Sequence, residues 1–320
     1  MASDASTLTL TVTGEYPVTV ERLWDAYADP RQLERFWGPV EWPATFTRHD
    51  MAVGGMSHYH MTGPDGTQAR GWFRFLAVEP HRRFEVEDGF ADAAGAPDPR
   101  MPTMRMVYTF AATPTGSRCT SVTHFTSIDA MEQLVGMGML EGMQSALGQL
   151  DALLADLRRF AFDRTTEAQL LSDTQVRVSR VVRGTVAQVW HAHHDAALMQ
   201  RWLLGPDGWT MPVCEVATTV GSSYRYEWES ADGSQRFGFE GELLERAAPH
   251  RAVTTERMIG MEGPGTTNEL TLVPVQLGTL LSIVITYPSK ELRDMILGTG
   301  MTTGMEASYA RLEQELLTAV

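Results

Sequence analysis

The chain contains one sequence pattern twice, and this internal repeat limits its possible folds more than any other feature. Leu23-Trp24-Asp25-Ala26 in the first half matches Val189-Trp190-His191-Ala192 in the second half, 166 residues later. Near the end of each half, Gly136-x-Gly138-x-x-x-Gly142-Met143 matches Gly298-x-Gly300-x-x-x-Gly304-Met305. A repeat of about half the chain length predicts that one fold occurs twice.

The length of 320 residues suits two domains of ordinary size. We expect the first domain to span residues 1–158 and the second to span residues 174–320. Residues 159–173 are polar, partly charged and unmatched by the repeat, so we expect them to form the linker.

Both copies predict the same order of elements. A strand (Leu8 to Gly14, or Val176 to Val182) leads into two short helices, several strands separated by turn residues, and one long helix. Apolar residues three or four apart define the long helix, namely Leu140, Met143, Leu147, Leu150 and Leu154, then Met301, Met305, Tyr309, Leu312 and Leu316. This order predicts an α+β fold made of two tandem helix-grip domains, in each of which a curved antiparallel sheet surrounds the long C-terminal helix.

Charge and composition exclude several classes of function. The chain has 26 basic and 40 acidic residues, and its net charge of −14 repels phosphate backbones and anionic lipid surfaces. We therefore expect no nucleic acid as a partner. No apolar run approaches the roughly 18 residues of a membrane span, so we expect no membrane insertion.

The two cysteines and the N-terminal sequence indicate where such a chain would work. Cys119 and Cys214 form no metal-like pair, and unpaired thiols suit a reducing compartment. The first residues carry neither the basic nor the apolar region of a secretory leader. We therefore expect a cytoplasmic protein. The sequence gives no indication of its oligomeric state.

The halves carry an ordered set of motifs: the Val-x-x-Leu/Val-Trp-x-Ala start at Val20 and Val186, the Asp-x-x-x-x-x-Arg-Phe/Trp segment ending at Phe36 and Trp202, Val53-Gly54-Gly55, an Asp-Gly turn, Pro80-His81-Arg82, and Gly142-Met143. Together these motifs resemble the START/Bet v 1-like (SRPBCC) superfamily, specifically bacterial homologues of the C-terminal domain of the activator of the heat-shock-protein-90 ATPase. The family more often has Gly-Trp at the last place, so Met143 and Met305 depart from its pattern. The superfamily includes lipid carriers, cyclases, hormone receptors and chaperone cofactors, so the resemblance specifies a fold better than a function.

The resemblance implies a cavity between the sheet and the long helix, lined by inward-facing strand residues. Alternation along the strands, oriented by the resemblance, turns one face of each toward that cavity. The expected ligand-binding residues are Trp37, Ser57, Tyr59, Met61, Met104, Met106, Tyr108, Met143, Tyr224, Tyr226, Trp228 and Met305. Aromatic rings and adaptable methionines suit an amphiphilic ligand, although the same residues are also typical of an ordinary core.

His124 is the candidate for a catalytic acid or base. It shares strand parity with Thr120 and Val122, which the resemblance turns inward, and its counterpart in the second copy is Thr286. An imidazole in an apolar cavity could move a proton, while a lone histidine is more often a core residue.

Metal and nucleotide sites have weak support. His58-x-His60 and the pair His191 and His194 have ligand-like spacing, but neither pair has an evident third ligand. The repeated glycines depart from the dinucleotide-binding spacing and fall at the start of a helix. We therefore predict no metal and no cofactor.

Three hypotheses for function remain. The first is a protein that binds a hydrophobic or amphiphilic small molecule, mainly in the first domain, because Tyr224 and Trp228 add rings to the second interior where the first has Ser57 and Met61. The second is a cyclase, dehydratase or isomerase that uses the same cavity. The third is a co-chaperone-like protein with an ATPase as its protein partner.

Overall fold

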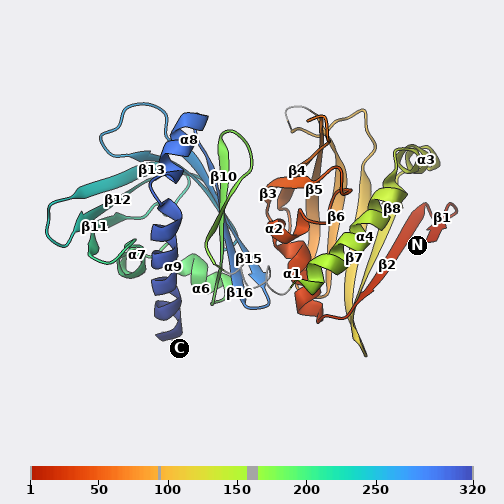
Figure 1. Ribbon diagram of the computed structural model, residues 1–320, viewed down its shortest axis with the longest axis horizontal. Helices are drawn as coiled ribbons and strands as arrows, with labels where there is room; N and C mark the ends of the chain where they lie inside the picture. Colours follow the sequence, from red (N-terminus) through yellow and green to blue (C-terminus); the bar gives the residue numbers. More distant parts are fainter. Residues whose placement is uncertain (1, 93–94, 157–164, 319–320) are drawn as a thin grey trace. The chain divides into compact units, whose positions relative to one another are not determined.

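The computed structural model describes residues 2–92, 95–156 and 165–318. The chain divides into two compact units, Met1–Arg159 and Phe160–Val320. Each unit contains an eight-stranded antiparallel sheet and a long helix that lies across one face of it (Figure 1). The prediction of two tandem α+β helix-grip domains is therefore confirmed.

The first sheet has the order β1-β2-β8-β7-β6-β5-β4-β3. Its strands are β1 (Ala2–Asp4), β2 (Thr9–Tyr16), β3 (Ala44–His49), β4 (Met56–Thr62), β5 (Gln68–Glu79), β6 (Arg83–Ala91), β7 (Met104–Thr113) and β8 (Gly116–Phe125). Its helices are α1 (Val20–Ala28), α2 (Pro30–Leu33), α3 (Ile128–Gly136) and α4 (Met139–Ala155). Thr19 begins α1 because its side chain accepts a hydrogen bond from the backbone N–H of Arg22.

The second sheet repeats this topology in the order β11-β12-β13-β14-β15-β16-β10-β9. Its strands are β9 (Glu167–Leu170), β10 (Gln175–Val182), β11 (Trp209–Glu215), β12 (Ser223–Ser230), β13 (Arg236–Ala247), β14 (Arg251–Met258), β15 (Thr266–Val275) and β16 (Gly278–Thr286). Its helices are α6 (Val186–Ala192), α7 (Ala196–Trp202), α8 (Lys290–Leu297) and α9 (Met301–Thr318).

The expected linker, residues 159–173, overlaps a strand of the second sheet. Residues 157–164 lie outside the described residues. Within the remainder, β9 pairs antiparallel with β10 and forms an edge of the second sheet. The expectation is wrong for this stretch because an edge strand needs only backbone pairing on one side and tolerates a polar sequence.

A short helix precedes each long helix, which the sequence analysis did not predict. Gly138 and Gly300 stand between the short and the long helix with φ of 89° and 81°. A left-handed conformation of this kind favours glycine and breaks the helical path. The repeated glycine motif therefore marks the break between two helices.

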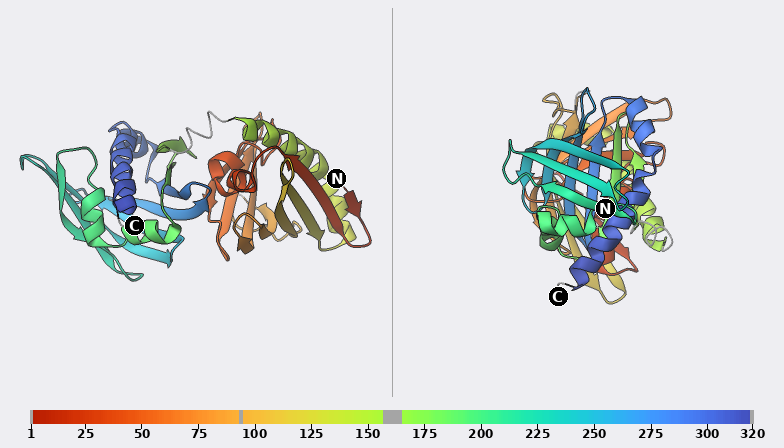
Figure 2. Two further views of the ribbon diagram at one scale, coloured as in Figure 1. Left: turned by 90° about the horizontal axis from the view of Figure 1, so that it is seen from below. Right: turned by 90° about the vertical axis from the view of Figure 1, so that its left-hand side faces the viewer.

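The two cores differ in composition. In the first domain, rings from α1 and the central strands pack edge to face, such as Trp24 on Phe110 at 5.2 Å and Tyr27 on Phe110 at 5.4 Å between centroids. In the second domain, aliphatic strand residues such as Leu272 and Leu281 pack against α9. Figure 2 shows the second sheet curving around that helix.

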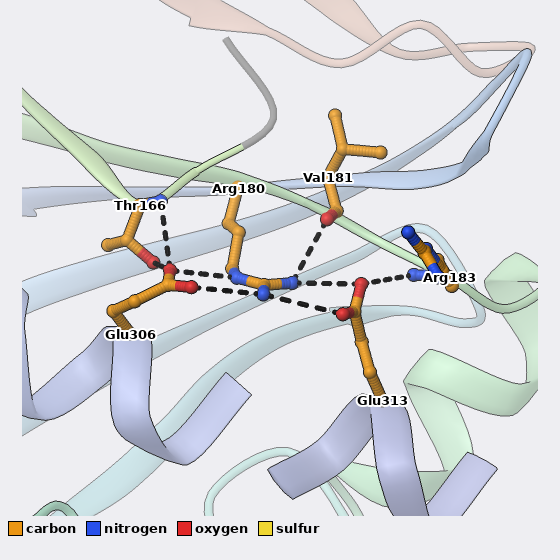
Figure 3. A network of polar contacts seen from close by, with 6 residues as sticks. All are labelled: Thr166, Arg180, Val181, Arg183, Glu306 and Glu313. Atoms are coloured by element: carbon orange, nitrogen blue, oxygen red, sulfur yellow. Dashed lines mark hydrogen bonds and ion pairs between the residues drawn. The ribbon is translucent and has the colours of Figure 1, made fainter. Parts of the chain in front are cut away.

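A buried arginine holds α9 against β10 (Figure 3). Arg180 has 7% side-chain exposure, and its guanidinium donates to Glu306 at 2.9 and 3.1 Å and pairs with Glu313 at 3.0 Å. The backbone N–H of Arg183 also donates to Glu313, at 2.9 Å. These contacts fix the helix that forms one wall of the site described next.

Candidate functional site: a cavity beside α9

The second domain contains a cavity of about 760 Å³ between the inner face of the sheet and the helices α8 and α9. The loop from β14 to β15 and the segment after α7 complete its wall. Large apolar side chains dominate the lining, among them Trp209, Trp228, Phe237, Phe239, Ile285, Leu292, Ile296, Met301, Met305 and Tyr309.

Aromatic rings form the wall contributed by β12 and β13. Trp228 stacks on Phe237 with centroids 5.2 Å apart and meets Phe239 edge to face at 5.9 Å. Strand alternation places Phe237 and Phe239 on one face. The indole N–H of Trp228 donates to the carbonyl of Leu203 at 2.6 Å, so the polar atom of the ring is satisfied within the protein. This wall therefore presents apolar surface to the cavity.

Methionines surround the outer part of the cavity. Met258, Met261 and Met295 are 38%, 50% and 58% exposed, while Met301 and Met305 are half-buried along α9. Unbranched thioether side chains adapt to irregular shapes. A mouth of this kind can accommodate apolar molecules of different outline.

Glu256 places a carboxyl in the cavity wall. It lies on the inner face of β14, where the Tyr224 hydroxyl donates to it at 3.4 Å and the Asn268 side chain forms a second hydrogen bond. Its side chain keeps intermediate exposure because it borders the open cavity, although protein surrounds it closely. This burial raises the pKa of Glu256 above its usual value, and the two hydrogen bonds partly oppose the rise.

Tyr287 adds a hydroxyl group to the same cavity. Its side chain is 3% exposed, and within the described part of the chain the hydroxyl oxygen has no hydrogen-bond partner. Burial, followed by the charge of Glu256, raises the pKa of Tyr287 to about 12. The oxygen is closed off from solvent, and a buried hydroxyl without a partner among the described residues is costly, so a ligand group that reaches it would offset this cost.

The predicted residues of β12 face the interior. Trp228 lines the cavity together with Met305, while Tyr224 and Tyr226 continue the same face with centroids 4.8 Å apart. The Tyr224 hydroxyl also donates to the carbonyl of Thr255 at 2.8 Å. These three side chains therefore lie on one face of β12. Beside these rings a volume of about 760 Å³ remains open in the second domain.

The predicted residues around β4 lie in the ring-packed part of the first domain. Tyr59 stacks on Phe46 at 5.1 Å, and Trp37 meets Tyr59 at 6.0 Å between centroids. Ser57 is fully buried and hydrogen-bonds the His49 ring at 2.9 Å. Met61 shares this strand with Ser57 and Tyr59, four and two residues away.

The predicted residues of β7 are also interior. Met104, Met106 and Tyr108 are 8%, 5% and 6% exposed, and Tyr108 stacks on Phe84 at 4.5 Å. Met143 is half-buried on α4. The structure therefore places the first-domain set in one interior, while the described cavity lies in the second domain.

His124 does not face the interior of the first domain. On β8 the buried residues are Ser117, Cys119, Ser121, Thr123 and Phe125, and His124 has the opposite parity. It lies between Thr9 of β2 and Arg105 of β7 in the ladder. The prediction is wrong because it turned the other face of β8 toward the interior. Side chains alternate along a strand with a period of two, so an error of one residue moves every side chain to the opposite face of the sheet.

Two interior carboxyls, Glu256 and Asp88, were not among the residues predicted from the sequence. Asp88 is 6% exposed on β6, and burial raises its pKa to about 7. A signal for it existed in the sequence, since Phe84, Val86 and Asp88 share one strand face and the first two are apolar. An acid that continues an apolar face is a candidate functional residue.

Two further observations concern metals and membranes. Across residues 2–92, 95–156 and 165–318, no three His, Cys, Asp or Glu side chains lie close enough together to hold a metal ion. Over the same ranges, no helix has the length and apolar character needed to cross a membrane.

Comparisons with solved structures find similar single-domain proteins. A protein from Arthrobacter aurescens is 41% identical over 48% of this chain and 90% of its own, with a TM-score of 0.47. A Mycobacterium smegmatis protein is 45% identical over 48% of this chain and 94% of its own, with a TM-score of 0.45. No curated protein matches.

The family model described as "Activator of Hsp90 ATPase homolog 1-like protein" matches residues 17–155 and again residues 183–316. The two matched regions correspond to the two structural units and together cover most of the chain. The chain therefore belongs to the activator of Hsp90 ATPase homolog 1-like family and carries its domain twice.

Proposed function

We propose that the protein binds a hydrophobic or amphiphilic small molecule in the cavity of its second domain. The observation that carries this proposal is an open volume of about 760 Å³ lined by stacked rings and methionines. This volume falls within the range of about 300 to 1,000 Å³ that is typical of small-molecule sites. The sequence favoured the first domain, but the described cavity moves the proposal to the second.

A repeated glycine provides a test that separates the two domains. Gly304 lies in α9 at the cavity wall, and a Cβ atom built there meets only Pro206, at 3.8 Å. Gly304→Leu should therefore fill part of the cavity without a clash, and leucine favours the helix more than glycine does. Gly142 occupies the matching position in α4, and a Cβ atom there meets nothing within 4 Å. Gly142→Leu is thus the matched control.

The assay is titration of the full chain with Nile red, a neutral apolar dye whose emission increases in apolar surroundings. The wild-type chain and Gly142→Leu should bind the dye equally, while Gly304→Leu should bind it at least about tenfold more weakly because leucine occupies the space. Unchanged binding in Gly304→Leu, or loss of binding in Gly142→Leu alone, would contradict the proposal.

A co-chaperone role is a second candidate, and the family match carries it. The name of the matched family refers to activation of the Hsp90 ATPase. A coupled assay of ATP hydrolysis by Hsp90 tests this role, because an activator should raise the turnover rate as the full chain is added. An unchanged rate at saturating chain would count against it.

A further inference from the structure

The two domains carry an interior carboxyl at the same structural position. In the first domain the backbone of Phe75 bonds that of Gly54 and Gly55, and in the second domain Leu243 bonds Gly221 and Ser222 in the same way. Phe75 and Leu243 are therefore equivalent, 168 residues apart.

The neighbouring strands extend this equivalence. Val86 of β6 lies opposite Phe75, and Thr254 of β14 lies opposite Leu243. Two residues further along each strand, on the same face, come Asp88 and Glu256. Both copies thus place an acid at one interior position, although the strands around it differ in sequence.

Neither acid is held by a cation. Within the described ranges, Asp88 and Glu256 form no ion pair with arginine, lysine or histidine. A carboxyl in such a place destabilises the fold relative to an apolar side chain of similar size. Glu256 has the Tyr224 hydroxyl and the Asn268 side chain as partners, whereas Asp88 has burial alone. The recurrence of an acid at one interior position, without a cation in either copy, points to a role toward a ligand.

In the second domain this acid and a tyrosine are two of the polar residues that line the cavity. Glu256 can accept a hydrogen bond, and the unpartnered hydroxyl of Tyr287 can donate one. Arg293 also acts electrostatically on Tyr287, but its guanidinium is held by Asp294 at 2.6 Å and by the Ser172 carbonyl at 2.6 Å. Glu256 and Tyr287 thus add one acceptor and one donor to a mainly apolar lining that also includes Arg257, Glu262, Thr266, Thr299 and Ser308.

Three kinds of polar group can be compared at this pair. A hydroxyl can donate to Glu256 and accept from Tyr287 at the same time. An ether can only accept, so it leaves Glu256 without a new partner. A carboxylate cannot donate, and an ionised Glu256 repels it.

We propose that Glu256 and Tyr287 recognise the hydroxyl group of an otherwise apolar ligand, such as a long-chain alcohol or a phenol. This inference rests on the proposed function, since it names the class of molecule that the second-domain cavity takes.

The experiment is displacement of Nile red from the full chain by three compounds with the same ten-carbon tail. Decan-1-ol should displace the dye at concentrations about tenfold lower than either decyl methyl ether or decanoate, because only the alcohol makes both hydrogen bonds. Equal displacement by the alcohol and the ether in the wild-type chain would overturn the inference.

Two variants assign the preference to these residues. Tyr287→Phe removes only a hydroxyl without a protein partner, so the fold should be retained while the preference for the alcohol falls to less than about threefold. Glu256→Met, which keeps a similar size, should reduce the preference to the same extent. Full preference in both variants would overturn the assignment, as would its loss in the first-domain control Asp88→Asn.

The outcomes separate this inference from the proposed function. If Nile red does not bind, or if Gly304→Leu leaves its binding unchanged, the proposed function fails. If Gly304→Leu abolishes binding but the alcohol has no advantage over the ether, the proposed function stands and the role of Glu256 and Tyr287 is refuted.

Discussion

Replacing Asp88 by asparagine should stabilise the first domain at neutral and higher pH. The side chain is 6% exposed, and no hydrogen bond or ion pair joins it to the described residues. The two phenols that feel its charge, Tyr59 and Tyr108, have pKa values raised above 10 and stay neutral in the range considered. The titration of Asp88 therefore depends mainly on its own burial.

The size of the effect follows from the pKa of Asp88 in the two states. Burial raises this pKa from 3.8 in the exposed state to about 7 in the fold. Between these values the folded chain binds the proton and the unfolded chain has lost it, so stability falls as the pH rises and then levels off above about pH 7. A shift of roughly three units corresponds to about 4 kcal/mol. An asparagine side chain does not titrate, so the Asp88→Asn variant should lack this loss.

Methionine methyl NMR during urea unfolding of the full chain reports the first domain separately. Met104 lies opposite Asp88 in the ladder and Met106 follows on the same face, while Met305 reports the second domain. The wild-type first domain should lose most of these roughly 4 kcal/mol between about pH 4 and pH 8, and Asp88→Asn should not.

The neighbouring acid provides the control. Glu87 points to the outer face and pairs with Arg74, with side chains 33% and 51% exposed. Exposed pairs contribute about 0 to 1 kcal/mol, so Glu87→Gln should leave the pH dependence close to that of the wild type. Parallel pH profiles for the wild type and Asp88→Asn would refute the reasoning, since Asp88 would then titrate as an exposed acid.

Two further predictions concern the long helix and the thiols. Arg180→Met removes the buried guanidinium beside Glu306, so amide hydrogen exchange in α9 should become faster. Arg201→Met replaces a side chain that is 59% exposed and should change the exchange rate little. Equal exchange rates in the two variants would contradict the prediction. Burial raises the pKa of Cys119 to about 12, so mass spectrometry should find this thiol unlabelled by iodoacetamide in the native chain near pH 8 and labelled in urea. Complete native labelling would contradict it.

The fold could be predicted because many weak signals agree. No single motif specifies a helix-grip domain, but the same motifs occur in one order in both halves, and the order of strands and helices follows them. The α3 and α8 helices were missed because each is short and ends near glycines that also suit a loop. Sequence periodicity thus predicted the long elements better than the junctions between them.

The orientation of single strands was less predictable than their existence. On β12 three rings alternate with charged residues along the strand, so the sequence itself distinguishes the two faces. On β8, Thr120, Val122 and His124 look as suitable for an interior as Ser121, Thr123 and Phe125 do. Only the pairing with β7 and β2 determines which of these sets lies inside.

The site of the cavity could not be predicted from one strand, because rings change places between neighbouring strands. Relative to Ser57, Tyr224 adds a ring on β12, but that ring lies over Gly241, where the first domain has Phe73. The adjacent strands then lose rings at equivalent inner positions, since Phe84 and Tyr108 of the first domain correspond to Ala252 and Leu270 of the second. Interiors are close-packed, so the open volume depends on the sum of these exchanges across the sheet. In the second domain these ring exchanges leave Glu256 at the wall of the cavity. In the first domain Asp88 lies in an interior that also contains the rings of Phe84 and Tyr108.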